Sequence, residues 1–163
     1  MRYVVSLVAA VFLLALVHVP QADARGQSSR VERTERALIR AINHQRRAAG
    51  LRRVHMSRRL SRAADRHSRE MLAGNYFAHS SADGGSFEGR VRRYARRGAV
   101  GETLAMLTAC NRGMPAAVIA MWLGSPAHRA IMLSPAFRRV GIGRRSGTLG
   151  GGAACLVTAD FAA

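Results

Sequence analysis

The sequence contains no lysine, although it is strongly basic. All 26 of its cationic residues are arginine, against nine aspartate and glutamate residues, and the formal net charge is +17. Such a charge favours acidic partners, for example nucleic acid, anionic lipid or an anionic cell wall. The preference for arginine has a second explanation, because a GC-rich genome selects arginine codons wherever a positive surface residue is tolerated. The arginines are spread along the whole chain, which favours this second explanation.

Aromatic residues are also scarce. Phenylalanine, tyrosine and tryptophan make up 6% of the chain, with a single tryptophan. Proteins that bind single-stranded nucleic acid stack bases on aromatic side chains. The scarcity therefore argues against a nucleic-acid partner, and binding of an anionic polymer through arginine stays open as a hypothesis about the surface.

Only one long hydrophobic run is present, and it lies at the start of the chain. Arg2 precedes an apolar stretch at residues 3–17, Pro20 breaks it, and Ala22-Asp23-Ala24 has the small-x-small pattern of a cleavage site. These features predict a secretory signal peptide at residues 1–24. The alternative is a transmembrane anchor, but the run is shorter than the roughly 20 residues that a spanning helix needs. We therefore expect an extracellular, periplasmic or cell-envelope location, with no transmembrane segment after cleavage.

The two cysteines, Cys110 and Cys155, complete the list of scarce residues. In an exported chain, an even pair of cysteines indicates one disulfide bond. Closing that loop would stabilise the fold by roughly 4 kcal/mol in the chain-entropy model. The alternative is a pair of buried free thiols, because the sequence does not give the distance between the sulfurs.

The rest of the chain has the size of one domain, which is large enough to bury a core. We expect a flexible polar lead-in at residues 25–33 and a single domain at residues 34–163. Apolar periodicity, caps and turn residues predict helices before strands, which indicates an α+β fold with an antiparallel sheet. The expected helices lie near residues 31–50, 57–74, 86–94, 115–122 and 125–133, and the expected extended segments near residues 98–107, 138–144 and 154–161.

Three segments combine a titratable group with turn-forming residues. His79 follows two aromatic residues in a loop, Glu102 lies in an otherwise apolar stretch, and His128 follows Ser125-Pro126. A buried carboxylate is costly unless it is paired, so Glu102 should have a partner. Spacing alone leaves two interpretations open. The three residues can share one site, or they can be loop histidines and a glutamate that pairs with any of many arginines.

An ordered set of motifs spans residues 34–161 and resembles bacterial members of the CAP superfamily. This superfamily contains cysteine-rich secretory proteins, antigen 5 and pathogenesis-related class 1 proteins. No single motif is decisive, but their order and spacing together are specific. The matching segments are Asn43-His44-Gln45-Arg46, Gly50-Leu51, His67-Ser68-Arg69-Glu70-Met71, Tyr76-Phe77-Ala78-His79-Ser80, Asp83-Gly84, Gly101-Glu102, Trp122, Ser125-Pro126-Ala127-His128-Arg129, Val140-Gly141-Ile142-Gly143 and Thr158-Ala159-Asp160-Phe161.

The resemblance implies an α-β-α sandwich with a small central antiparallel sheet and a cavity lined by histidine and glutamate. By motif, His79 and His128 correspond to the two cavity histidines, and Glu102 to the cavity glutamate. The resemblance also implies that His79 and His128 can hold zinc or another divalent ion, which suits neutral imidazole. Two departures bear on this site: Thr103 replaces the usual asparagine, and Ser125 replaces the second glutamate of eukaryotic members.

Three functional hypotheses follow. The leading one is a secreted, non-catalytic module that binds a small ligand, lipid, peptide or cell-envelope component, because no nucleophile–base–oxyanion set is evident. The second is a metal-assisted hydrolase of peptide or ester bonds, in which His79 and His128 hold the ion and Glu102 acts as general base. The third is anionic-polymer binding through arginine. We interpret His67 as a core histidine and not as a ligand.

Overall fold

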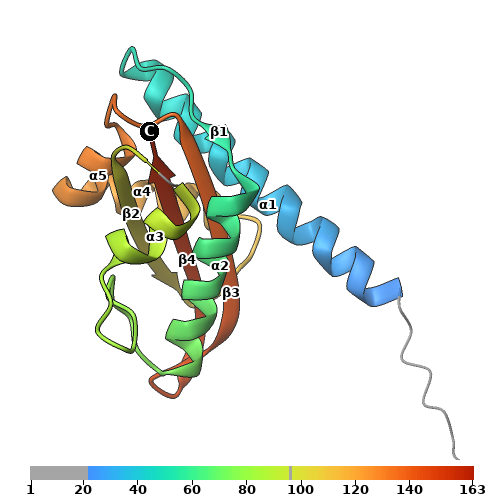
Figure 1. The fold of residues 1–163 in the computed structure, drawn as a ribbon. Helices are drawn as coiled ribbons and strands as arrows, with labels where there is room; N and C mark the ends of the chain where they lie inside the picture. The colour runs from blue at the N-terminus through green and yellow to red at the C-terminus, as the bar shows by residue number, and fades with distance from the viewer. Residues whose placement is uncertain (1–21, 96) are drawn as a thin grey trace, which may run out of the picture.

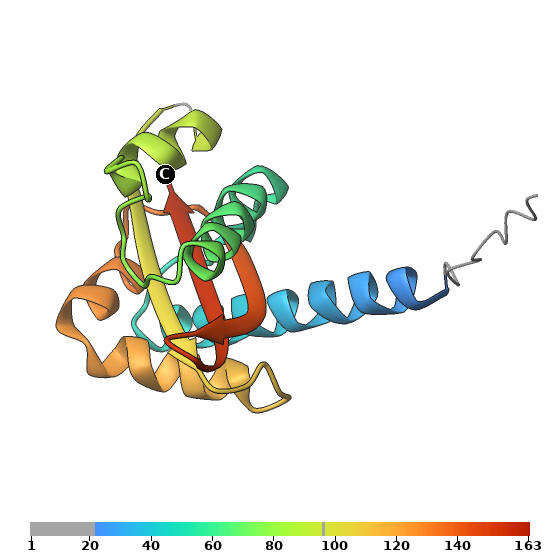
Figure 2. The same cartoon turned by 90° about the horizontal axis from the view of Figure 1, so that it is seen from below.

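The structure is a computed structural model that describes residues 22–95 and 97–163. The four strands form one sheet, and the five helices enclose it in two layers (Figures 1 and 2). This arrangement confirms the expected α+β class and α-β-α sandwich. In chain order the elements are α1 (Ala22–Ala48), β1 (His55–Met56), α2 (Arg58–Ala73), α3 (Phe87–Ala95), β2 (Val100–Leu107), α4 (Met114–Gly124), α5 (Pro126–Met132), β3 (Arg139–Leu149) and β4 (Gly152–Ala162).

The structure describes the N-terminal segment only from Ala22 onward. Residues 1–21 of the predicted signal peptide lie outside the described residues. The helix α1 begins at Ala22, so the segment expected as a flexible lead-in, residues 25–33, is helical and extends from the body of the molecule (Figure 1). Within the described residues, no helix combines the length and the apolar character that crossing a membrane requires.

The sheet has the strand order β1-β3-β4-β2. The three long strands are antiparallel, as expected, whereas the two-residue strand β1 pairs in parallel with β3 and makes the sheet mixed. β1 lies in the connector expected after the first helix. The buried Asn43 side chain fixes this connector, because its amide donates to Val54 O at 2.9 Å and its oxygen accepts from Val54 N at 2.8 Å.

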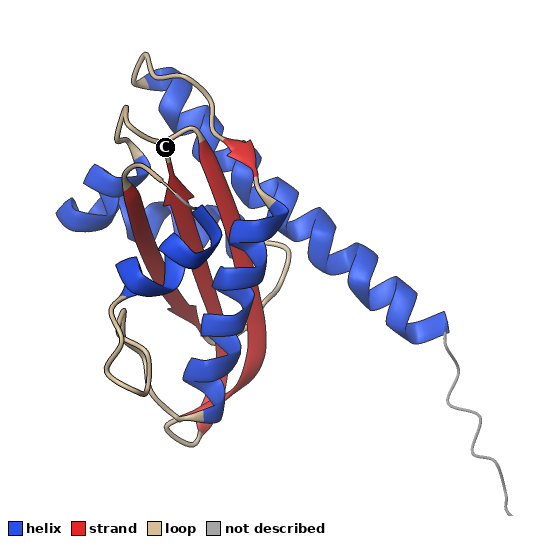
Figure 3. Cartoon of the chain, viewed as in Figure 1, coloured by secondary structure: helices blue, strands red, loops and turns tan. Residues whose placement is uncertain are grey.

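The helices divide between the two faces of the sheet. α2 and α3 cover one face, and α1, α4 and α5 lie on the other (Figures 2 and 3). α2 begins and ends where the sequence predicts: Ser57 caps its start by accepting from Leu60 N, and Gly74 follows its last turn. Its buried side chains, Leu60, Ala63, Ala64, His67, Ser68 and Met71, contain the stripe expected from the periodicity apart from the half-buried Leu72.

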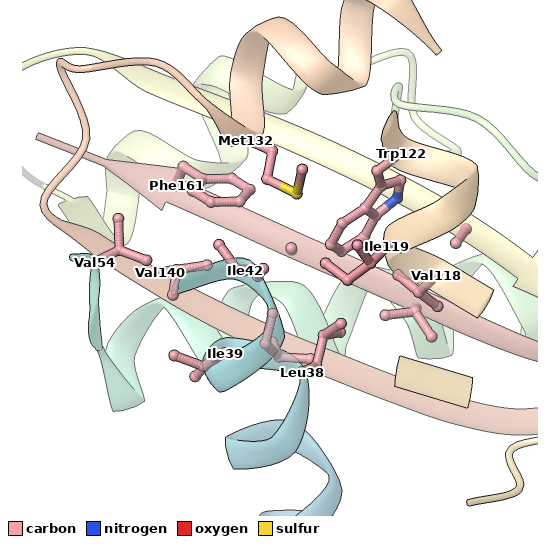
Figure 4. Packing of buried hydrophobic residues seen from close by; sticks show 14 of the residues in the cluster. Leu38, Ile39, Ile42, Val54, Val118, Ile119, Trp122, Met132, Val140 and Phe161 are labelled. Carbon is pink, nitrogen blue, oxygen red and sulfur yellow. The ribbon is translucent and has the colours of Figure 1, made fainter. Parts of the chain in front are cut away.

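The main core lies between the sheet and the layer of α1 and α4 (Figure 4). Leu38 and Ile42 of α1 pack there with Trp122 of α4 and Phe161 of β4, and all four are fully buried. The Trp122 indole also donates to Leu104 O at 2.9 Å, which ties α4 to β2. Trp122 is thus a core anchor, as the sequence indicates.

One disulfide bond links the segment after β2 to β4. Cys110 is bonded to Cys155 of β4, with the two Cα atoms 5.2 Å apart and a sequence separation of 45. The expected pairing is confirmed, and the alternative of two free thiols is excluded.

A carboxyl group of α1 makes stability depend on pH. Burial, reinforced by the nearby charge of Asp65, raises the pKa of Glu35 to about 7, although Arg144 opposes the shift. The folded protein then binds more protons than the unfolded chain between pH 4.5 and 7, so this group's contribution to stability falls as the pH rises through that window. We expect Glu35→Gln to raise the Tm by roughly 2–4 °C above about pH 7 and to leave it unchanged below pH 4.5.

Thermal unfolding followed by circular dichroism at both pH values measures this difference. Glu32→Gln is the matched control, because Glu32 lies on the same helix in an exposed pair with Arg36. Exposed pairs of this kind contribute little, and the charge of Glu32 is only a minor cause of the raised pKa of Glu35, so above about pH 7 the control should change the Tm by much less than Glu35→Gln does. An equal response of the two variants would contradict the assignment to Glu35.

Candidate functional site

The loop after α2 carries His79 and is fixed at two points. The fully buried His67 donates from Nε2 to Ala78 O at 2.9 Å, and Glu70 Oε1 accepts from Ala82 N at 2.7 Å. Asn75 begins the loop in the left-handed region, with φ of 51°. The expected core histidine, His67, therefore also positions the loop, and His79 is held between its two anchor points.

Glu102 is the buried centre of the site. Its side chain has no exposed surface, its Oε1 is 2.8 Å from His79 Nδ1, and its Oε2 accepts from Arg90 Nη2 at 2.5 Å. Burial alone would raise the pKa of Glu102, but the hydrogen bond from His79 and the adjacent Arg90 guanidinium outweigh it and hold the pKa below its usual value. Glu102 is thus an ionised acceptor with both oxygens engaged.

Arg90 is a site residue that sequence reasoning missed. It lies on α3, its side chain is nine-tenths buried, and it also donates to Ser81 Oγ at 2.9 Å and to His79 O at 3.1 Å. It therefore fixes both the Glu102 carboxylate and the backbone of the histidine loop. The available signal was its position on the apolar stripe of α3 between Phe87 and Tyr94. Because arginine is abundant throughout the sequence, this position did not distinguish Arg90 from the other arginines.

His128 reaches the same site from α5. Ser125 caps this short helix, with its hydroxyl accepting from His128 N at 3.5 Å. The His79 and His128 rings have centroids 5.9 Å apart and planes inclined at 55°, and the centroid of the Phe87 ring lies 6.1 Å from that of His79. Burial, and secondarily the charge of His79, lower the pKa of His128. The three residues expected to share a site, His79, Glu102 and His128, are therefore brought together.

Asp160 is a second carboxyl group and lies next to Glu102 in the sheet. It is the cross-strand partner of Glu102 in the pairing of β2 with β4, and it is completely buried. Burial, together with the negative charge of Glu102, raises the pKa of Asp160 well above its usual value. Both causes favour the protonated form of Asp160, which lessens the repulsion that two facing carboxylates would produce. The sequence presents it only as part of a strand motif.

The side chains of this site match a bound metal only in part. The Nδ1 atom of His79 is engaged with Glu102, which leaves its Nε2 and the His128 ring as nitrogen ligands. A catalytic zinc normally has three protein ligands, and within the part of the chain that the structure describes there is no group of three histidine, cysteine, aspartate or glutamate residues that could hold a metal ion. The residues thus do not fit a three-ligand centre, and metal binding by His79 and His128 stays a prediction.

A separate apolar pocket adjoins the His128 helix. It has a volume of about 610 Å³ and lies along α4, α5 and the turn that follows. Leu123, Pro126, Leu133 and Pro135 give it an apolar wall, and Arg129 supplies a cation. Its size falls in the range of pockets that bind small molecules.

Comparison with solved structures agrees with this architecture. An outer surface protein from Borrelia burgdorferi aligns with a TM-score of 0.65 and 17% identity, over 80% of this chain and 92% of that one. An extracellular protein containing an SCP domain from Bacillus anthracis aligns with a TM-score of 0.64 and 23% identity, over 80% of this chain and 40% of that one. At these identities the similarity shows the shared fold.

Comparison at the sequence level adds the family. The uncharacterised protein YkwD from Bacillus subtilis is 29% identical over 115 residues, which is 71% of this chain and 44% of YkwD. The chain thus matches less than half the length of that relative. The family model described as CAP, the cysteine-rich secretory protein family, matches residues 39–159. Because that match covers most of the chain, this protein belongs to the cysteine-rich secretory protein (CAP) family.

Proposed function

We propose that this chain is an exported, non-catalytic binding module whose ligand docks on the paired imidazoles of His79 and His128. The observation that carries the proposal is that the Glu102 carboxylate is already hydrogen-bonded within the protein. Both of its oxygens are bonded, one to His79 and one to Arg90. A carboxylate held in this way orients the imidazole next to it, and each of its two oxygens already accepts a charge-assisted hydrogen bond.

The same observation argues against the hydrolase alternative. A general base works best when its pKa lies near the working pH, whereas the pKa of Glu102 lies below its usual value because of its bonds to His79 and Arg90. The site also provides two metal ligands where a catalytic ion uses three. Glu102 is therefore a positioning residue for His79 in this proposal.

The ligand would be a polar molecule from outside the cell, such as a peptide or a cell-envelope component. The His79 side chain is 47% exposed, and Phe87 provides an aromatic surface next to it. Neutral imidazole both donates and accepts hydrogen bonds, which suits a ligand with mixed polar groups. Export follows from the predicted signal peptide.

A lipid is a second candidate because of the apolar pocket beside α5. The aliphatic side chains of Leu123 and Leu133 would accommodate an acyl chain, and Arg129 at the pocket wall would pair with its anionic head. This pocket and the imidazole pair lie on different residues of α5, so variants can separate them.

Binding assays with matched histidine variants test the proposal. The purified protein is titrated with soluble cell-wall fragments and, separately, with oleate. We expect His79→Ala/His128→Ala to weaken binding of the wall fragments at least about tenfold, which corresponds to about 1.4 kcal/mol. His55→Ala is the control, because His55 is exposed on β1. Binding of oleate that is lost in Arg129→Gln would instead support the lipid pocket.

Two outcomes would contradict the proposal. One is binding of wall fragments no tighter than that of an unrelated arginine-rich protein, with the same salt dependence, since that would show attraction to charge alone. The other is metal-dependent cleavage of peptide or ester substrates that disappears in Glu102→Gln, since that would establish the hydrolase.

A further inference from the structure

A second, polar cleft lies between α2, α3 and the loop that joins them. It has a volume of about 350 Å³, and its lining includes Arg66, Glu70, Ser81, Asp83, Arg93 and Tyr94. Neither His79 nor His128 is among its lining residues. Arg90, which donates to Glu102 and to the backbone of His79, also lines the cleft. The cleft therefore adjoins the imidazole pair but presents other side chains, and the function proposed above does not use it.

The charges of the cleft are arranged along its length. Glu70 is bonded to the loop through Ala82 N, so this end of α2 lies beside Ser81 and Asp83. At the other end of α2, Leu60 packs with Val91 and Ala95 of α3, so the two helices run in opposite directions.

This arrangement gives the cleft a basic end and an acidic end. Arg66 lies one turn nearer the start of α2 than Glu70, and Arg93 lies in the last turn of α3. Because α3 runs antiparallel to α2, the two arginines are on the same side of the cleft, away from Asp83. Four helical residues span about 6 Å, which gives the approximate separation between the basic and acidic ends.

Glu70 is already engaged, because its Oε1 accepts from Ala82 N and its Oε2 lies 3.5 Å from His67 Nδ1, but each carboxylate oxygen can accept a further bond. The other charged groups of the cleft have bonding capacity to spare. Arg66 and Arg93 are exposed, and neither side chain forms a hydrogen bond or ion pair with the residues that the structure describes. Asp83 uses Oδ1 to accept from Gly85 N at 2.9 Å, which leaves Oδ2 available. Ser81 Oγ already accepts from Arg90, so its hydroxyl hydrogen is available to donate into the cleft.

From this arrangement we infer that the cleft binds a short zwitterionic peptide, with the terminal carboxylate on Arg66 and Arg93 and the terminal ammonium group on Glu70 and Asp83. Arginine has a planar fork that matches a carboxylate in two parallel bonds. Each extended residue spans about 3.3–3.6 Å, so the charges of a dipeptide lie about as far apart as the two ends of the cleft. A free amino acid is too short to reach both.

The test is a titration of the purified protein with L-alanyl-L-alanine, followed by NMR amide shifts in α2 and α3. The capped forms, N-acetyl-alanyl-alanine and alanyl-alanine amide, each lack one charge. Because each charged terminus would form charge-assisted hydrogen bonds in the cleft, we expect each capped form to bind at least about tenfold more weakly.

Variants identify which residues hold the peptide. Arg66→Gln/Arg93→Gln should abolish the response to alanyl-alanine, and Asp83→Asn, which keeps an acceptor for Gly85 N, should weaken it. Arg62→Gln is the control, because Arg62 is exposed on α2 but does not line the cleft. The His79→Ala/His128→Ala protein should bind the dipeptide normally, which keeps this test independent of the imidazole site.

Three results of these peptide titrations would overturn the inference. They are no amide shifts at millimolar dipeptide, equal binding of the N-acetylated form, or equal loss of binding in Arg62→Gln. Inorganic phosphate that produces the same shifts as the dipeptide at the same concentration would also overturn it, since it would identify a site for anions alone.

Discussion

Gly141→Ala is expected to destabilise the fold strongly, because the backbone of α2 lies directly against β3 at this position. A Cβ atom at Gly141 would overlap Ser61 N and Leu60 C, both backbone atoms of the helix. Gly143, two residues further along the strand, meets Asp65 N and Ala64 C in the same way. Real Cβ atoms do not approach other atoms this closely, so the helix would have to move.

The spacing explains why both positions are glycine. Two strand residues span about 6.6 Å, and four helical residues span about 6 Å. Successive turns of α2 therefore rest on Gly141 and Gly143. The position of the helix is also fixed by hydrogen bonds, from Ile142 N to Ser61 Oγ at 3.2 Å and between the Ser68 and Thr158 hydroxyls at 2.8 Å. Moving α2 away from β3 would break these bonds.

The expected decrease in the free energy of unfolding is large for the addition of a single methyl group. Overpacked cores usually lose about 1–3 kcal/mol, because side chains move aside. Here the obstacle is backbone, so we expect a loss above about 3 kcal/mol, measured by urea unfolding. Gly124→Ala is the control, since a Cβ at this helical position meets nothing within 4 Å. It should be neutral or stabilising by up to about 1 kcal/mol. A Gly141→Ala protein with wild-type stability would contradict the contact.

The glycine contacts show where sequence reasoning stops. The predicted strand at residues 138–144 and the apolar stripe of the second helix are both confirmed, because each follows from its own periodicity. The packing of the helix on the strand at two glycines, however, depends on tertiary structure, and neither periodicity predicts it. Glycine inside a strand is a known signal of close backbone approach, and alternation at Gly141 and Gly143 was the feature that could have predicted it.

The residues of the candidate site could likewise be predicted only in part from the sequence. His79 and Glu102 are 23 residues apart in sequence, and no periodicity relates them to His128. The family resemblance, and not spacing, indicated that the three would meet. It did not identify Arg90, whose bond to Glu102 changes what that carboxylate can do. Any of 26 arginines could have been the partner, and only the fold selects one.

Arg46 carries the second large prediction, because it is a completely buried cation without a carboxylate partner among the described residues. Its guanidinium is surrounded by backbone carbonyls. Nε donates to Arg52 O at 2.9 Å, Nη1 to Met132 O at 2.8 Å and to Ser134 O at 3.0 Å, and Nη2 to Phe137 O at 3.3 Å. These carbonyls belong to the connector after α1, to the last residue of α5 and to the segment that joins α5 to β3.

The side chain therefore joins three parts of the chain through one rigid group. Burial, and secondarily the charge of Arg138, lower the pKa of Arg46, but arginine remains charged in proteins. The carbonyl dipoles are what stabilise that charge. Without the guanidinium, four carbonyl oxygens would lose their donors and a cavity would remain, and each unsatisfied buried group costs about 1–3 kcal/mol.

We expect Arg46→Ala to lower the free energy of unfolding by about 3–5 kcal/mol, because buried carbonyls would lose their donors and a cavity would remain where the side chain was. Arg46→Lys should recover little, because a single ammonium group cannot reach four acceptors arranged around a planar fork. Arg47→Ala removes the same charge from an exposed neighbour and should change stability by less than about 0.5 kcal/mol. Since the two alanine variants have equal net charge, any difference between their urea midpoints reports the buried bonds. Equal midpoints would mean that the carbonyls do not depend on Arg46.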